Sequence, residues 1–95
     1  MRILAGIVGF DWNDGNRDKN LAKHGLTDTE CEEIFQDEHR QIYPDLRHSG
    51  DEERDIAVGK TKLGILLMVV FTIRSGGIRI ISARPINRKE RKLYE

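Results

Sequence analysis

Apolar residues come in short runs along the chain, separated by polar stretches, and their spacing changes from one run to the next. The first ten residues are almost wholly apolar and predict a strand. Asn13 or Asp14 then has the side chain of a helix N-cap, and the spacing that follows predicts a short helix over 15–24, which Gly25 ends in a left-handed conformation. His24 would lie on its last turn.

A second helix begins at Thr27, because Thr27 and Glu30 have the spacing of a capping box. Leu26 precedes the cap and is placed to pack against Cys31, as in a hydrophobic staple. We therefore expect one face of this helix to be buried, carrying Cys31, Ile34 and Phe35.

From residue 40 onward the apolar positions alternate with a period of two, which predicts strands. The first covers 41–44 and is followed by a polar loop over 45–51. A second strand opens at Arg54. Residues 64–72 are almost wholly apolar, which is typical of a central strand covered on both faces.

Ser75-Gly76-Gly77 predicts a tight hairpin turn into a last strand, which Pro85 ends. Asn87 and Glu90 again have capping-box spacing and predict a final helix to Tyr94. The order is β-α-α-β-β-β-β-α. Because adjacent strands are joined by short turns, we expect an α+β fold with a mostly antiparallel sheet of about five strands and three helices, in a single domain over 1–95.

Regular alternation along the last strand separates its two arginines. Arg79 points to one face, whereas Arg84 lies on the other together with the apolar residues, provided that no bulge intervenes. On the helix that follows, Arg88, Arg91 and Lys92 share a face at α-helical spacing. This basic stripe would continue the surface that Arg84 begins.

Composition adds limits on the kind of protein. The only cysteine, Cys31, excludes an intrachain disulfide and a cysteine-based zinc cluster, and it suits a reducing compartment. The longest apolar run is about half of the ~20 residues that cross a bilayer. The acidic residues after Phe10 do not fit a signal-peptide cleavage site. We expect a cytoplasmic protein that needs no cofactor.

The formal net charge is zero, but the charges are segregated along the chain. Residues 27–55 carry eleven acidic and three basic side chains, whereas residues 56–95 carry nine basic and two acidic ones. Such a basic segment can attract phosphate although the total charge cancels. A purely structural interpretation, in which both segments are solvated faces, is also open.

The sequence contains no metal-ligand spacing, phosphate-binding glycine loop or nucleophile elbow. RNA cleavage needs none of these, because RNA carries its own nucleophile, the 2′-hydroxyl, and requires only proton transfer and a phosphate clamp. His24 or Glu53 would transfer the proton. Arginines would bind the phosphate with Lys23. Each residue also has a structural interpretation, such as a helix-end charge or a salt bridge.

Two segments, 10–13 and 20–25 (Phe-Asp-Trp-Asn and Asn-Leu-Ala-Lys-His-Gly), resemble the BrnT toxin family. Further similar pieces follow in order to the end of the chain: Ile34-Phe35 with Asp37, Asp45, Glu53-Arg54, Gly59, the segment 79–84, and Glu90-Arg91 with Tyr94. Asn13 and Asn16 depart from the pattern, where relatives have Asp and Lys.

The resemblance implies a RelE-like fold and a metal-independent endoribonuclease that halts translation. It also implies a BrnA antitoxin with a ribbon-helix-helix domain, so that operator DNA is bound only through this partner and no membrane is involved. The residues it points to as catalytic are His24, Glu53, Arg79, Arg84 and Arg91. Lys23, Arg88, Lys92 and Tyr94 are the expected RNA-binding residues.

Other functions fit parts of the sequence. A non-catalytic binding module would use the same basic face to hold the acidic segment of a partner in a repressor complex. A repurposed relative would bind a small phosphorylated ligand, although no pocket motif supports it. A scaffold role has little support, because the chain has no repeat and no long amphipathic helix.

Overall fold

The computed structural model describes residues 9–46 and 53–95. Its sheet has the strand order β1-β5-β4-β3-β2, antiparallel except for the parallel pair β1–β5. The expected α+β class, the mostly antiparallel sheet and the order of elements are confirmed. Only the end of the expected first strand lies in the described residues. The strands are β1 (Gly9–Phe10), β2 (Gln41–Pro44), β3 (Asp55–Lys60), β4 (Leu66–Arg74) and β5 (Gly77–Pro85).

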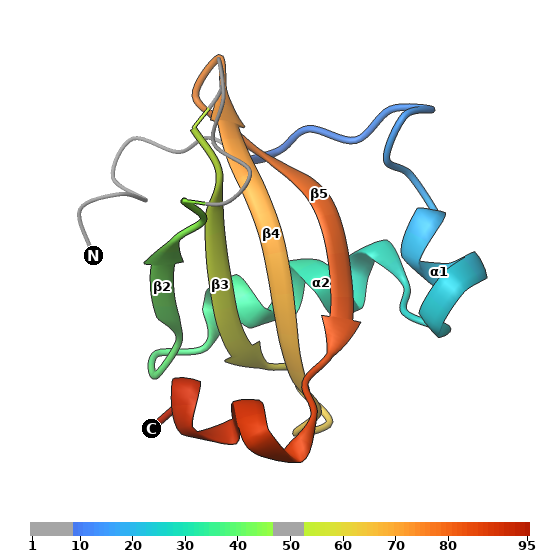
Figure 1. Cartoon of the computed structure of the whole chain (residues 1–95). Coiled ribbons are helices and arrows are strands. Elements are labelled where there is room, and N and C mark those ends of the chain that lie inside the picture. Colours follow the sequence, from blue (N-terminus) through green and yellow to red (C-terminus); the bar gives the residue numbers. More distant parts are fainter. Residues whose placement is uncertain (1–8, 47–52) are drawn as a thin grey trace.

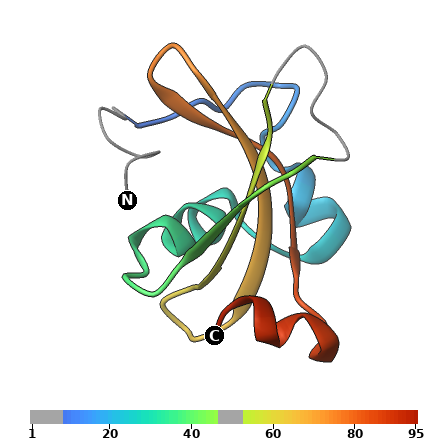
Figure 2. The same ribbon diagram turned by 60° about the vertical axis from the view of Figure 1, so that its left-hand side comes forward.

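The helices lie on different sides of this sheet (Figure 1). Helix α1 (Lys19–His24) lies beside the β5 edge, and α2 (Asp28–Glu33), continued by the 3₁₀ turn η2 (Ile34–Gln36), lies behind the strands. The C-terminal 3₁₀ helix η3 (Arg88–Leu93) crosses below the strands from the end of β5 toward β2, as the turned view in Figure 2 also shows. Among the described residues, no helix has the length and apolar character of a membrane span.

The core lies between α2–η2 and one face of the sheet. The second helix begins at Thr27 with the expected capping box, in which Thr27 Oγ1 accepts from Glu30 N and Glu30 Oε1 accepts from Thr27 N. This fixes the buried face that the sequence predicts: Cys31, Ile34 and Phe35 pack with Leu26. The sheet contributes Ala57, Leu67, Val69, Phe71, Ile78, Ile80 and Ala83 to the same cluster.

The expected helix over 15–24 is too long at its start. Residues 14–18 form turns, and α1 begins at Lys19, after Asp18 in a left-handed conformation with no side-chain cap. The Asn13 side chain caps only a turn, since its Oδ1 accepts from Gly15 N. The buried Asn16 amide instead donates to the carbonyls of Asp11 and Ile80, which anchors this segment to the sheet. The end at Gly25 is as expected, with φ of 70°.

The prediction that the central strand is covered on both faces is wrong. Leu67, Val69 and Phe71 of β4 are fully buried against the helices, but Met68 and Val70, which point to the other face, are only partly buried. Tyr43 of β2 also points away from the core, and its hydroxyl donates to the Leu93 carbonyl. Helix η3 therefore covers the second face on the β2 side, and among residues 9–46 and 53–95 no helix lies over that face at β4 and β5. We call this area the open face.

Strand β5 contains the bulge that reverses the expected direction of Arg84. Phe71 pairs with Ile80 and Val70 pairs with Ser82, so Ile81 is the extra residue on β5. A bulge of one residue shifts the alternation of side chains. Ser82 and Arg84 consequently share the open face with Arg79, and Ala83 joins the core.

The last helix is capped as expected but wound differently. Asn87 Oδ1 accepts from Glu90 N, and Glu90 Oε1 accepts from Asn87 N. From Arg88 to Leu93 the helix is 3₁₀, in which residues three apart are aligned. The expected shared face of Arg88, Arg91 and Lys92 is therefore divided, with Lys92 in a different row.

Candidate active site

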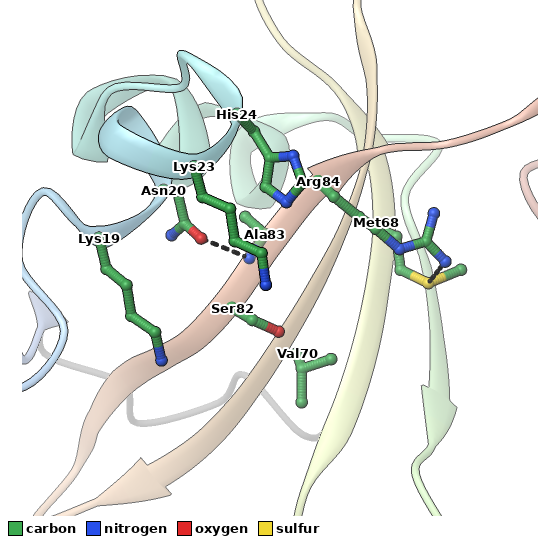
Figure 3. A pocket seen from close by; sticks show the side chains of 9 residues that line it. All are labelled: Lys19, Asn20, Lys23, His24, Met68, Val70, Ser82, Ala83 and Arg84. Carbon is green, nitrogen blue, oxygen red and sulfur yellow. Dashed lines mark hydrogen bonds between the residues drawn. The ribbon is translucent and has the colours of Figure 1, made fainter.

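A cavity of about 290 Å³ lies on the open face between α1 and the two central strands, and we call it the His24 cavity. Figure 3 shows its lining side chains: Lys19, Asn20, Lys23 and His24 of α1, Met68 and Val70 of β4, and Ser82, Ala83 and Arg84 of β5. The lysines reach from the helix over β5, whereas the Arg84 guanidinium turns toward Met68. Three cations and one imidazole thus surround a partly apolar hollow that can accept an anion.

Helix α1 is held at this position by Asn20, which is 2% exposed. Its Oδ1 accepts from Ala83 N at 2.9 Å, on the stretch of β5 that β1 does not reach. Lys19 Nζ donates to the carbonyl of the bulged Ile81 at 3.3 Å. The helix spacing then places Lys23 one turn after Lys19 on the same face, beside His24.

Arg84 is oriented by the last helix. Its Nη1 donates to Glu90 Oε1 at 2.8 Å and its Nη2 donates to Glu90 Oε2 at 2.6 Å. Hydrogen bonding to Arg84 lowers the pKa of Glu90 to about 2, and the same contact raises the pKa of Arg84. The Arg84 side chain keeps 42% of its surface exposed, so a cation remains accessible at the edge of the cavity.

Arg79 does not line the His24 cavity. It lines a second cavity of about 180 Å³, which we call the Arg79 cavity, together with Gly15, Asn16, Lys19, Arg54, Arg74, Ile80 and Ile81. Arg79 Nη2 donates to Asn13 Oδ1 at 3.1 Å, and Nη1 lies 3.7 Å from Asp11 Oδ2. Lys19 lines both cavities, and no other residue of the described part of the chain does so.

The other expected site residues lie away from the His24 cavity. Glu53 is exposed, and its carbonyl accepts from Thr72 Oγ1 at 2.7 Å near the start of β3. Arg88, Arg91 and Lys92 are exposed on η3 and line neither cavity. Of the nine residues predicted from the sequence, the structure brings Lys23, His24 and Arg84 together in one cavity.

Tyr94 packs at the opposite end of the sheet. Its hydroxyl donates to Asp37 Oδ2 at 2.6 Å, and Lys60 Nζ lies 5.5 Å from the centroid of its ring. Burial and the hydrogen bond to Asp37 raise the pKa of Tyr94 to about 12. Burial disfavours the Asp37 carboxylate, but the hydrogen bonds from Tyr94, His39 N and Lys60 N outweigh it and lower the pKa of Asp37. These contacts attach the C-terminal segment to η2 and β3.

Sequence reasoning missed Lys19, Ser82 and Met68, which line the His24 cavity. The spacing of Lys19 and Lys23 was a usable signal, since residues four apart share a helix face. Ser82 and Met68 carry no such local signal, because their positions in the cavity depend on the bulge in β5 and on the pairing of β5 with β4. Among the described residues, no group of three or more His, Cys, Asp or Glu side chains is arranged to hold a metal ion.

The fold and the open face define a class of small α+β proteins with a basic sheet surface. The ribonuclease toxin BrnT of Brucella abortus has this fold: its crystal structure matches with a TM-score of 0.63 and 23% sequence identity, over 85% of this chain and 99% of that one. The family model for the ribonuclease toxin BrnT of type II toxin-antitoxin systems matches residues 12–90. The chain therefore belongs to the BrnT family. No curated protein sequence matches it.

Proposed function

We propose that this chain is an endoribonuclease toxin that cleaves RNA without a metal ion, in the His24 cavity. The observation that carries the proposal is the convergence of one imidazole with two lysines and an arginine on the open face of the sheet. Guanidinium and ammonium groups bind phosphate oxygens and stabilise the charge that grows on them during attack. The family to which the chain belongs supports a ribonuclease and an antitoxin partner.

In the proposed reaction the 2′-hydroxyl oxygen attacks the adjacent phosphorus and the bond from phosphorus to the 5′-oxygen breaks. One proton leaves the 2′-hydroxyl and one proton reaches the 5′-oxygen. The products are a 2′,3′-cyclic phosphate and a 5′-hydroxyl. His24 carries one of these transfers, because it lines the cavity and an imidazole can donate a proton from one ring nitrogen and accept one at the other. Lys23, Lys19 and Arg84 bind the phosphate.

The experiment uses an RNA oligonucleotide, the purified chain and EDTA. We expect cleavage in EDTA, a cyclic phosphate product, and no cleavage where a 2′-deoxy nucleotide replaces the one that attacks. His24→Ala and Arg84→Ala should each lower kcat/KM roughly 100-fold or more. Lys89→Ala, which removes an exposed cation outside both cavities, is the matched control. Circular dichroism establishes that each variant is folded.

In the cell, we propose that the toxin acts in the cytoplasm, where its cleavage of RNA stops translation. A ribbon-helix-helix antitoxin of the BrnA kind covers the open face and supplies the binding to operator DNA. Expression of the parent chain should arrest growth with loss of RNA integrity, and coexpression of the antitoxin should restore growth. Intact RNA from a folded parent chain that still binds the antitoxin would support the binding module instead.

A further inference from the structure

The guanidinium group of Arg84 already makes hydrogen bonds from both of its terminal nitrogens. An arginine has one N–H on Nε and a pair on each Nη. Arg84 Nη1 donates to Glu90 Oε1 at 2.8 Å and to the Pro85 carbonyl at 3.2 Å. Nη2 donates to Glu90 Oε2 at 2.6 Å and to Met68 Sδ at 3.4 Å. Within the part of the chain that the structure describes, Nε–H is the one donor of Arg84 without an acceptor.

These contacts give the planar guanidinium two different edges. The end edge consists of Nη1 and Nη2, and the Glu90 carboxylate binds it with one oxygen on each nitrogen. The side edge consists of Nε and the second hydrogen of Nη2, where Met68 Sδ lies (Figure 3). Because Met68 lines the His24 cavity, the side edge faces that cavity. Arg84 Nε is not among the buried, unpaired polar atoms, so a ligand can reach this edge from solvent.

The two edges are occupied by acceptors of very different strength. Glu90 is an ionised partner, and its Oε1 also accepts from Asn87 N at 2.9 Å, which fixes the carboxylate within the cap of η3. The thioether of Met68 is a weak acceptor on a flexible side chain. A phosphate that displaced Glu90 would break two charge-assisted hydrogen bonds, whereas one that displaced Met68 Sδ would break a single weak one. The side edge is therefore the available phosphate-binding edge of Arg84.

We propose that Glu90 is a positioning residue for RNA cleavage, which holds the end edge of Arg84 so that the phosphate to be cleaved binds the side edge in place of Met68 Sδ. This proposal rests on the proposed function, in which Arg84 binds that phosphate. Two phosphate oxygens then accept from Nε and Nη2 of Arg84, in the bidentate geometry that suits a guanidinium. Without Glu90 the guanidinium keeps its charge but loses its orientation, and the phosphate is held less precisely relative to His24.

A double-mutant cycle on RNA cleavage tests the positioning role. We expect Glu90→Ala to lower kcat for an RNA oligonucleotide roughly tenfold or more without raising KM, because the cation remains but is no longer oriented. In the Arg84→Ala background, the same substitution should change kcat/KM less than about twofold, because no guanidinium is left to position. Asn87→Ala is the matched control. It removes the other side chain of the same capping box and leaves the Glu90 carboxylate in place, so kcat/KM should change less than about twofold.

Three results would overturn the positioning role. Equal losses from Glu90→Ala in both backgrounds, matched by Asn87→Ala, would show that Glu90 only stabilises η3. A higher kcat/KM in Glu90→Ala would show that Glu90 competes with RNA for Arg84. Arg84→Lys should stay close to Arg84→Ala in kcat/KM, because an ammonium group has no two planar edges. Recovery of the parent activity by Arg84→Lys would show that a positive charge suffices. Circular dichroism establishes that each variant is folded.

A measurement that needs no cleavage separates this proposal from the proposed function. The Nε–H resonance of Arg84, assigned with Arg84→Lys, is followed by NMR while a 2′-deoxy oligonucleotide is added. We expect a downfield shift in the parent chain, since Nε–H gains a phosphate acceptor, and a smaller shift in Glu90→Ala. An unmoved resonance in a parent chain that binds the oligonucleotide and cleaves RNA would overturn the edge assignment alone. A downfield shift in a parent chain that cuts nothing would keep the assignment and reject the nuclease.

Discussion

The buried side-chain amide of Asn20 joins helix α1 to strand β5. Its Oδ1 accepts from Ala83 N, and its Nδ2 lies 4.0 Å from Cys31 Sγ. Both neighbours are buried, so water cannot replace the acceptor. A buried N–H that loses its partner costs about 1–3 kcal/mol.

Asn20→Ala should therefore lower the free energy of unfolding by about 1–3 kcal/mol. It should also raise KM for RNA, because Lys23 and His24 lose the anchor of their helix. Urea unfolding followed by circular dichroism measures the first effect. Gln36→Ala removes an exposed amide and should change stability far less. A fully stable Asn20→Ala would contradict the assigned role of the amide.

The ion pair of Glu90 with Arg84 makes the free energy of unfolding depend on pH in a specific way. The folded-state pKa of Glu90, about 2, lies below its ordinary value of 4.5. Its ionised form therefore contributes stability that is complete above about pH 4.5 and is lost as the pH falls toward 2. Glu90→Gln keeps an oxygen for Asn87 N but removes the charge.

We expect Glu90→Gln to lower stability at pH 7 by about 1 kcal/mol or less, since the pair is partly exposed. Between pH 4.5 and 2, the variant should lose less stability than the parent chain. Unfolding in urea at a series of pH values measures both. Glu38→Gln is the control at an exposed position. Parallel acid curves for the parent and Glu90→Gln would show that the pair does not set this dependence.

Local sequence signals predicted part of the candidate site. His24 was placed at a helix end by Gly25, and Lys23 came with it, so both fell at the cavity through local signals. Arg84 was expected on the apolar face, and only the bulge at Ile81 brings it to the open face. No local pattern marks that bulge. The Arg79 cavity is lined by residues from distant parts of the chain, among them Arg54, Arg74 and Arg79. No single stretch of the sequence could predict that these residues lie together.

At the scale of elements, helix caps were the most predictable feature. Both capping boxes form as expected, because a cap needs only side chains three residues apart. Strand ends at Pro44 and near Pro85 were equally local. The start of α1 could not be predicted locally, because the Asn16 side chain donates to the carbonyl of Ile80, which is distant in the sequence. The 3₁₀ winding of η3 was not predicted either, and this helix is attached by contacts distant in sequence, from Tyr43 to the Leu93 carbonyl and from Tyr94 to Asp37.

Deletion of Ile81 tests the role of the bulge directly. Removal of one residue from a regular strand turns every later side chain to the other face. Here the bulge already adds one residue, so its removal restores regular alternation and keeps Ala83 in the core with Arg84 on the open face. We expect the deletion variant to fold and to unfold cooperatively. Strand β4 has no extra residue at Val69, so deletion of Val69 would turn the later side chains of β4 to the wrong face and should abolish folding. Thermal unfolding by circular dichroism compares them, and an unfolded Ile81 deletion would refute this account of β5.

The last helix is attached by its ends, and Tyr94 makes one of the attachments. Tyr94→Phe removes the hydroxyl that donates to Asp37 but keeps the ring under Lys60. Because Asp37 retains hydrogen bonds from His39 N and Lys60 N, we expect a loss of about 1–2 kcal/mol in the free energy of unfolding. Urea unfolding measures this loss. A weaker affinity for RNA at unchanged stability would instead support the phosphate-binding role expected from the sequence.

At the scale of the whole molecule, the zero net charge hides a separation of charge in space. Acidic residues concentrate in and after α2, which packs behind the sheet, whereas the cations of both cavities lie on the open face. The sheet and the core separate the two. In 0.15 M salt the Debye length is about 8 Å, so charges beyond that distance are largely screened from each other. The open face should therefore bind RNA as a basic surface.

Glu38→Lys tests this separation. Glu38 is exposed in the turn before β2, three strands away from β5, or roughly 14 Å across the sheet. Although the substitution adds two positive charges, it should change RNA affinity less than twofold at 0.15 M salt, because the separation exceeds the Debye length of about 8 Å. At 0.01 M salt, where the Debye length is about 30 Å, the same variant should bind RNA distinctly more tightly than the parent. Fluorescence anisotropy with a labelled 2′-deoxy oligonucleotide measures both conditions. A strong gain at 0.15 M salt would mean that the RNA reaches the β2 edge, and that the binding surface is wider than the two cavities.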